Sequence, residues 1–170
     1  MAYTVTGVPL LPQTQSLSCW YASARMIVQW RRELCQQTFA DEPAPDELPW
    51  AVSRQIANNG LQLVEMVHYA SLLGFRTVPP QTPTLGGIEQ WLRSYGPLWT
   101  AGLKVTATAS YGHVVVIVGV TGSQILIHDP EPVNVGSRVW RPTSWLTTTL
   151  SLATQSIPTN FMHYPGLACS

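Results

Sequence analysis

A glutamine and a cysteine near the start of the sequence are spaced in a way that suits acyl transfer. Cys19 begins an amphipathic stretch that we predict to be a helix, and Gln13 lies six residues before it. A thiol in the first turn of a helix feels the positive end of the helix dipole, which favours the thiolate. The Gln13 side chain can direct an amide N–H toward the sulfur, where it would form an oxyanion hole with the backbone N–H of Cys19.

A cysteine nucleophile also needs a base and a group that orients the base. His113 is the best candidate for the base because it begins an apolar strand, and Gly112 before it leaves backbone room for a substrate. Asp129 follows the next strand, so folding of the hairpin returns it to the level of His113. The remaining histidines are expected to be structural or exposed, namely His68, His128 and His163.

The turn between these two strands decides whether His113 and Asp129 meet. If residues 121–123 form a three-residue turn, Asp129 lies opposite Val115, and the side chains of His113 and Asp129 share one face of the sheet. A two-residue turn would place Asp129 on the other face. Three-residue hairpins prefer glycine at the last position, whereas Gly122 is central, so the sequence leaves the turn type open.

Each of these features has an ordinary structural interpretation when it is taken alone. A single cysteine in a helix is most often a small buried hydrophobic residue, and a glutamine six residues before a cysteine occurs by chance in many chains. His113 and Asp129 could be a polar strand end and a turn. Their occurrence together, in the order that a cysteine hydrolase uses, favours catalysis.

The elements that must position these residues form a helical first part and a strand-rich second part. After an extended arm, apolar periodicity predicts four helices, over residues 18–36, 50–58, 61–73 and 84–94. Ser16 or Ser18 can cap the first of these helices, and Thr84 the last. Strands are predicted over residues 75–78, 98–105, 114–120, 124–128, 138–141 and 160–164. This order indicates one α+β domain over residues 1–170, with a cleft between two packed parts.

The composition limits the partners of the chain. Of its 170 residues 45% are hydrophobic and 11% are charged, which excludes a disordered protein. Nine basic residues balance nine acidic ones without a basic patch, so neither nucleic acid nor a membrane is expected as a partner. The spacings C-x2-C and H-E-x-x-H are absent, and no metal or other cofactor is expected.

The three cysteines form an odd set, so at least one is free or pairs between chains. Cys19 and Cys35 would lie about 24 Å apart on one helix, at a rise of 1.5 Å per residue, which is too far for a bond. A bond between Cys35 and Cys169 remains open. We expect a reducing compartment and no structural disulfide.

The residues described above resemble the papain-like superfamily of cysteine proteases. The resemblance rests on Gln13-x5-Cys19-Trp20, the run from Gly112 to Val116, and Asp129-Pro130. It is closest to compact bacterial branches, namely plant-pathogen effector proteases of papain fold and the double-glycine peptidase domains of bacteriocin exporters. It implies a cysteine helix packed against a small antiparallel sheet. The implied roles are nucleophile for Cys19, base and acid for His113, orienting residue for Asp129 and oxyanion donor for Gln13.

Three positions depart from these relatives. Leu17 stands where papain itself has glycine, Asp129 where papain has asparagine, and Trp20 where the double-glycine peptidases have glycine. A preference for Gly-Gly sites therefore stays open.

The resemblance also implies a biological setting. Free-standing bacterial domains of this kind often act as secreted toxins or effectors on a protein substrate, and such toxins usually travel with an immunity protein. The N-terminal residues lack the pattern of a signal peptide. Synthesis in the bacterial cytoplasm is expected, followed either by injection into a target cell through a specialised secretion system or by action as a cytosolic enzyme.

The sequence thus predicts hydrolysis of a peptide bond in a target protein through a thioester. The same three residue types also carry out deamidation, transglutamination and the amidase chemistry of peptidoglycan hydrolases, and no residue fixes the acyl acceptor. A catalytically silent binding module with a papain-like shell is the remaining alternative.

Overall fold

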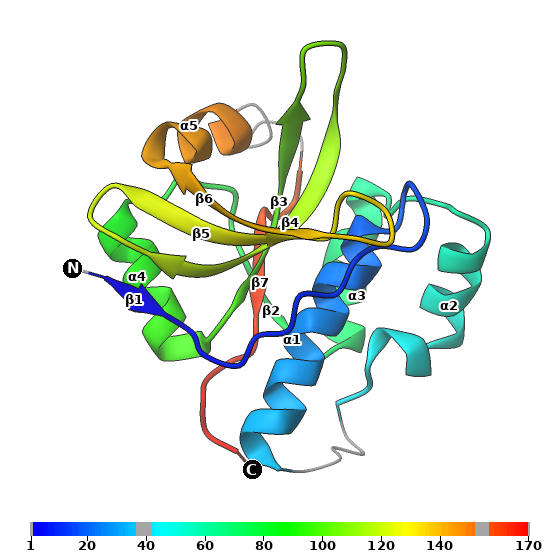
Figure 1. Ribbon diagram of the computed structural model, residues 1–170. Helices are drawn as coiled ribbons and strands as arrows, with labels where there is room; N and C mark the ends of the chain where they lie inside the picture. The colour runs from blue at the N-terminus through cyan, green and yellow to red at the C-terminus, as the bar shows by residue number, and fades with distance from the viewer. Residues whose placement is uncertain (1, 37–41, 152–156, 170) are drawn as a thin grey trace.

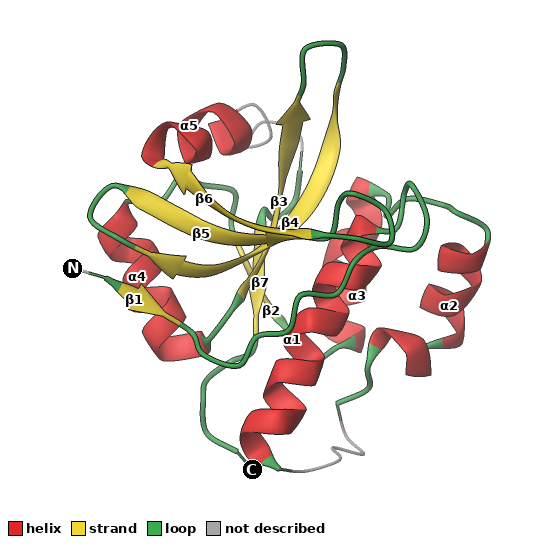
Figure 2. Ribbon diagram, viewed as in Figure 1, coloured by secondary structure: helices red, strands yellow, loops and turns green. Residues whose placement is uncertain are grey.

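An antiparallel sheet runs through the middle of the computed structural model, which describes residues 2–36, 42–151 and 157–169 (Figure 1). Its strand order is β2-β7-β3-β4-β5-β6, and β1 pairs with β4 outside this path. The strands are β1 (Tyr3–Thr4), β2 (Arg76–Val78), β3 (Leu98–Val105), β4 (Ser110–Val120), β5 (Gln124–Asp129), β6 (Ser137–Pro142) and β7 (Phe161–His163). The α-helices are α1 (Cys19–Cys35), α2 (Pro49–Ile56), α3 (Met66–Leu72), α4 (Leu85–Tyr95) and α5 (Thr143–Ser151). The predicted α+β class is confirmed (Figure 2).

Strand β4 contributes to two hydrophobic cores because its side chains alternate between the faces of the sheet. Val116 belongs to the core that includes side chains of α1 and α3, whereas Ile117 belongs to the core that includes side chains of α4 and α5. Both residues are fully buried. Burial on both faces explains why this strand reads as a continuous apolar run. It also makes β4 a rigid support for His113, which lies near its beginning.

In the β4–β5 hairpin, His113 and Asp129 lie on the same face of the sheet, although the turn between the strands differs from the three-residue turn considered above. Val120 pairs with Ile125, and the Thr121 N–H donates to the Gln124 carbonyl at 2.8 Å, so the turn itself has two residues. A β-bulge between Ile117 and Gly119 then shifts the pairing by one residue. The bulge cancels the effect of the short turn. Asp129 therefore returns to the position opposite Val115 that a three-residue turn would have given.

Several element boundaries differ from those predicted. The arm before α1 contains strand β1, which pairs with Val120 and Gly119. The helix predicted over residues 61–73 begins with a 3-10 turn, Leu63–Glu65, before α3. Helix α5 was not predicted, since its threonines favour strands; it packs instead through Leu146, which is buried in the core with α4. No helix in the described ranges has the length and apolarity to cross a membrane.

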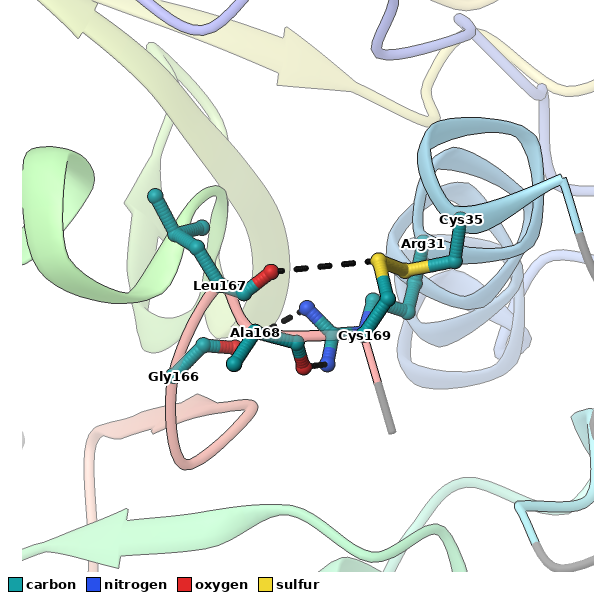
Figure 3. The surroundings of a disulfide bond; sticks show 6 residues. All are labelled: Arg31, Cys35, Gly166, Leu167, Ala168 and Cys169. Atoms are coloured by element: carbon teal, nitrogen blue, oxygen red, sulfur yellow. Dashed lines mark hydrogen bonds between the residues drawn. A yellow bond between two sulfur atoms is a disulfide. The ribbon is translucent and has the colours of Figure 1, made fainter.

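A disulfide joins the end of α1 to the C-terminal tail, and the prediction of no structural disulfide is therefore wrong. Cys35 and Cys169 are bonded, with a Cα–Cα distance of 5.5 Å (Figure 3). Arg31, one turn earlier on α1, donates from its guanidinium to the carbonyls of Gly166 and Ala168 (Figure 3). After β7 the chain loops away and then returns to the last turns of α1, where the C-terminus lies (Figure 1). The sequence alone does not show that the C-terminal tail lies beside α1, so it could not establish the bond between Cys35 and Cys169.

Candidate active site

The loop from Gln13 to Ser18 delivers Cys19 to the first position of α1. Cys19 carries the free thiol of the described chain and is partly exposed. The predicted cap is wrong, because neither Ser16 nor Ser18 accepts a bond from the first turn. Ser18 instead exchanges two bonds of 3.1 Å with the backbone of Gln15. The N-terminal backbone donors of α1 thus stay without a side-chain cap beside the sulfur.

His113 and Asp129 form a buried pair on the sheet. The exposed fractions of the two residues are 7% and 3%, and His113 Nε2 lies 2.6 Å from Asp129 Oδ1. The backbone N–H of Glu131 donates to the same carboxylate oxygen at 2.9 Å. This second bond fixes the orientation of the carboxylate toward the ring. The juxtaposition predicted for His113 and Asp129 is present.

The thiol of Cys19 lies at the same imidazole. Burial lowers the pKa of His113, but hydrogen bonds to Asp129 and to Cys19 outweigh burial and raise that pKa to about 9. Because Nε2 bonds Asp129, Nδ1 is the ring nitrogen left for the sulfur. Burial also raises the pKa of Asp129, yet the interactions with His113 dominate and hold it below its ordinary value. At neutral pH the site therefore contains an imidazolium whose charge the Asp129 carboxylate stabilises.

Gln13 is buried and is not among the residues that line the cleft with Cys19 and His113; its side chain is engaged within the loop. Its Nε2 donates to the carbonyls of Gln15 at 2.9 Å and Ser16 at 3.0 Å. Its Oε1 is buried without a hydrogen-bond partner among the described residues. The amide thus stabilises the loop that leads to Cys19 in this state. Donation to a substrate oxygen requires one of these N–H groups to turn away from the loop.

Three polar residues beside the His113–Asp129 pair were missed in the sequence. Lys104 donates to Asp129 Oδ2 at 2.9 Å and to Glu131 Oε2 at 2.5 Å, and Tyr111 donates to the same Glu131 oxygen at 2.9 Å. The register of β3 and β4, with Lys104 opposite Tyr111, creates this cluster. The sequence carries no signal for this cluster, because the register between neighbouring strands brings its members together.

Potential metal ligands also gather here. One donor atom each from His113, Asp129 and Glu131 lies within 4.8 Å of the others, the spacing of a small cation site. The Lys104 ammonium already bridges the two carboxylates. A cation of the chain thus already lies between the two acidic groups.

A cleft of about 520 Å³ opens between α1 and the sheet, with Cys19 and His113 both on its surface. Most of its other wall residues are apolar or aromatic: Leu17, Trp20, Leu61, Leu63, Met66, Trp99, Ala101, Leu103, Tyr111, Val114 and Ile157. The predicted cleft between the helical part and the sheet is therefore present. An apolar surface therefore lies next to Cys19 and His113.

The other histidines lie outside this site, as predicted. His128 is buried and its Nδ1 lies 3.2 Å from the Pro9 carbonyl. His163 is buried and stacks on Tyr95, with ring centroids 4.0 Å apart. His68 is exposed and contacts Trp50 edge to face. None of the three lines the cleft.

Comparisons with known proteins give a family match and a shared fold. The model of a family described as papain-like cysteine protease AvrRpt2 matches residues 3–140, which span Gln13, Cys19, His113 and Asp129. A search of curated protein sequences finds no significant match. The crystal structure of a protein described as a C39-like peptidase from Bacillus anthracis superposes with a TM-score of 0.57. It shares 12% identity and covers 96% of this chain and 97% of its own, so it shows a shared fold. The chain accordingly belongs to the papain-like cysteine protease family whose model it matches.

Proposed function

We propose that the protein hydrolyses a peptide bond with Cys19 as nucleophile, His113 as base and acid, and Asp129 as the residue that orients the imidazole. The observation that carries the proposal is the position of His113 between the Asp129 carboxylate, at 2.6 Å, and the Cys19 thiol. A thiolate paired with an imidazolium is the reactive form of such a nucleophile.

The reaction runs in two halves. The Cys19 thiolate attacks the substrate carbonyl, His113 gives its proton to the leaving amine, and the C–N bond breaks to leave a thioester. Neutral His113 then takes a proton from water, the hydroxide attacks the thioester, and the C–S bond breaks to release the acid and the thiolate. Asp129 keeps His113 oriented through both halves. The cycle ends with the Cys19 thiolate and protonated His113, the state in which it began.

The oxyanion would be held at the start of α1. The backbone N–H of Cys19 lies at the uncapped end of the helix, where the helix dipole favours negative charge. Gln13 supplies the second donor when its amide turns from the Ser16 carbonyl toward the substrate. This movement exchanges one hydrogen bond for another, so its cost is small.

The apolar cleft supports a peptide substrate with an apolar side chain next to the scissile bond. Trp20, Leu61 and Met66 would remove such a side chain from water, at about 25 cal/mol for each Å² buried. The preference for Gly-Gly sites stays a prediction. Peptides that carry either an apolar residue or Gly-Gly before the cleaved bond, compared by mass spectrometry, distinguish the two.

The same peptides test the reaction type. Wild type should produce backbone fragments, and Cys19→Ala should leave the peptides intact. A gain of one mass unit on glutamine without fragments would show deamidation instead. Attachment of an amine to glutamine would show transglutamination, and release of peptide stems from peptidoglycan would show amidase activity.

We also propose that the enzyme acts outside the cytoplasm in which it is made, as a secreted toxin or effector. The Cys35–Cys169 bond supports this setting, because disulfides persist in oxidising compartments and cytosolic thiols are kept reduced. Delivery into a target-cell cytoplasm would expose the bond to reduction. An immunity protein that covers the cleft would be the expected partner of a toxin.

A further inference from the structure

The carboxylate of Glu131 lies close to the ring nitrogen that faces the nucleophile. Its Oε1 is 3.9 Å from His113 Nδ1, whereas Nε2 of the same ring is occupied by Asp129 at 2.6 Å. Hydrogen bonds of this kind form at about 2.7–3.2 Å, so a closing movement of about 1 Å would let Glu131 accept the Nδ1 proton. That proton is the one that the Cys19 thiolate needs as its partner. Glu131 is therefore a potential competitor of the nucleophile.

Two donors hold Glu131 away by its other oxygen. Lys104 Nζ and Tyr111 Oη lie 2.5 Å and 2.9 Å from Oε2. Burial lowers the pKa of Lys104, but its bonds to Glu131 and Asp129 outweigh burial and raise that pKa above its ordinary value. Lys104 thus stays an ammonium while it bridges both carboxylates. Its side chain is 26% exposed and those of Asp129 and Glu131 are 4% and 19% exposed, so solvent screens these contacts only in part.

Lys104 balances part of the negative charge around His113. With His113 protonated, two cations balance the two carboxylates of Asp129 and Glu131. The imidazolium then remains available to the Cys19 thiolate. Without the lysine, two carboxylates and a thiolate would compete for one imidazolium. Lys104 is also the only lysine in the sequence, so no neighbouring ammonium can replace it.

We propose that Lys104 is a positioning residue of the protease, which bridges Asp129 and Glu131 and keeps Glu131 from taking the His113 Nδ1–H away from the Cys19 thiolate. This proposal rests on the proposed function, because it gives Lys104 a task only if Cys19 and His113 form the reactive pair. It makes a distinctive prediction. Loss of Lys104 should lower the reactivity of Cys19 because Glu131 then competes for the His113 proton. Removal of the Glu131 charge should restore that reactivity.

The rate at which iodoacetamide alkylates Cys19 tests this without knowledge of the substrate. Cys35 and Cys169 are bonded, so the reagent reads the free thiol alone. At about pH 6, below the ordinary pKa of a thiol, the rate reports the thiolate–imidazolium pair. Lys104→Met should slow alkylation about tenfold, the effect of one pKa unit. Lys104→Met/Glu131→Gln should return to within about threefold of wild type, and Glu131→Gln alone should stay near wild type.

The alkylation rate of Cys19 should also be measured across the pH range, in addition to the rates at about pH 6. The profile reports the titration of the reactive pair in the field of the charged and titratable groups around His113. These groups are Cys19 of α1, Lys104 of β3, Tyr111 of β4, Asp129, Glu131 and Arg141 of β6. Arg141 lines an adjoining cavity together with Lys104, His113 and Asp129. The expected change in Lys104→Met is a shift of the acid side of the profile toward higher pH. The double variant should reverse this shift.

Matched variants separate this role from simple stabilisation. Arg93→Met removes the cation of the Arg93–Glu89 pair on α4, outside the cleft, and should alkylate like wild type. If Lys104→Met does not fold, Tyr111→Phe removes the other donor to Glu131. It should cause a smaller slowing that Glu131→Gln also relieves.

The outcomes distinguish the two proposals. If the double variant is as slow as Lys104→Met or slower, or if Lys104→Met matches wild type, the positioning role of Lys104 is refuted and the triad is untouched. If wild type at about pH 6 reacts no faster than a free cysteine, whose pKa is about 8.5, the proposed function itself fails.

Discussion

The backbone N–H of Gln13 donates to the carbonyl of Pro130 at 2.9 Å, which joins the loop before Cys19 to the loop after Asp129. The Asn134 N–H returns a bond to the Gln13 carbonyl at 2.8 Å. These two bonds cross between the helical part and the sheet. They hold the nucleophile and the His113–Asp129 pair in one geometry through backbone groups, which vary less in position than side chains do.

Asp129→Asn should move the alkaline limit of activity to lower pH. The carboxylate helps to raise the pKa of His113 to about 9, and a neutral amide cannot stabilise the imidazolium in the same way. We expect the alkaline limb of kcat/KM to fall by about one to two pH units, the usual effect of one close opposite charge. Peptide cleavage measured across pH gives the limb directly. Glu89→Gln on α4 is the control, and an unmoved limb in Asp129→Asn would contradict the role given to Asp129.

The stability of the protein should depend on pH through the same histidine. Because the folded pKa of His113 is about 9 and the ordinary value is 6.5, the folded state binds the proton more tightly than the unfolded state. The resulting stability is fully present below pH 6.5 and is lost as the pH rises through about 9. Urea unfolding at both ends of this range should show a larger loss in wild type than in His113→Gln. Equal losses would show that His113 does not carry this dependence.

The Cys35–Cys169 bond should contribute substantially to stability. It closes a separation of 134 residues, which restricts the unfolded chain. Cys35→Ser/Cys169→Ser should lower the free energy of unfolding by about 2–4 kcal/mol, measured by thermal or urea unfolding. The alkylation rate of Cys19 should stay the same, because the bond lies at the other end of α1. Wild type in reductant should reproduce the variant, and an unchanged melting temperature would exclude this contribution.

Gln13→Ala should lower kcat more than it raises KM. A donor to the oxyanion acts on charge that develops in the transition state, and loss of one such donor costs about 10²–10³ in kcat. Steady-state kinetics on a cleaved peptide separate the two constants. Gln55→Ala serves as the control, because Gln55 donates to Thr14 in the same loop but is not a proposed oxyanion donor. A rise in KM alone would assign Gln13 to loop structure only.

Local patterns in the sequence predicted most of the elements. The α1 helix, strand β3 and the apolar run of β4 follow from periodicity, and Cys19, His113 and Asp129 were selected from their places at the ends of such elements. The Asp129 position depended on a two-residue turn and a bulge that cancel each other, and only the paired strands reveal both.

Features that depend on distant parts of the chain were not predictable. Lys104 meets Asp129 and Glu131 only through the register of three strands. The Cys35–Cys169 bond depends on the path of the C-terminal tail. Helix α5 is rich in threonine and is stabilised by packing of Leu146 rather than by helix propensity.

The central claim is that Cys19, activated by His113 and Asp129, cleaves peptide bonds in other proteins. Its most direct test is N-terminal proteomics of bacteria that express either wild type or Cys19→Ala at equal levels. We predict new protein N-termini in the wild-type sample that are missing from the Cys19→Ala sample. The same set of N-termini in both samples would contradict the claim.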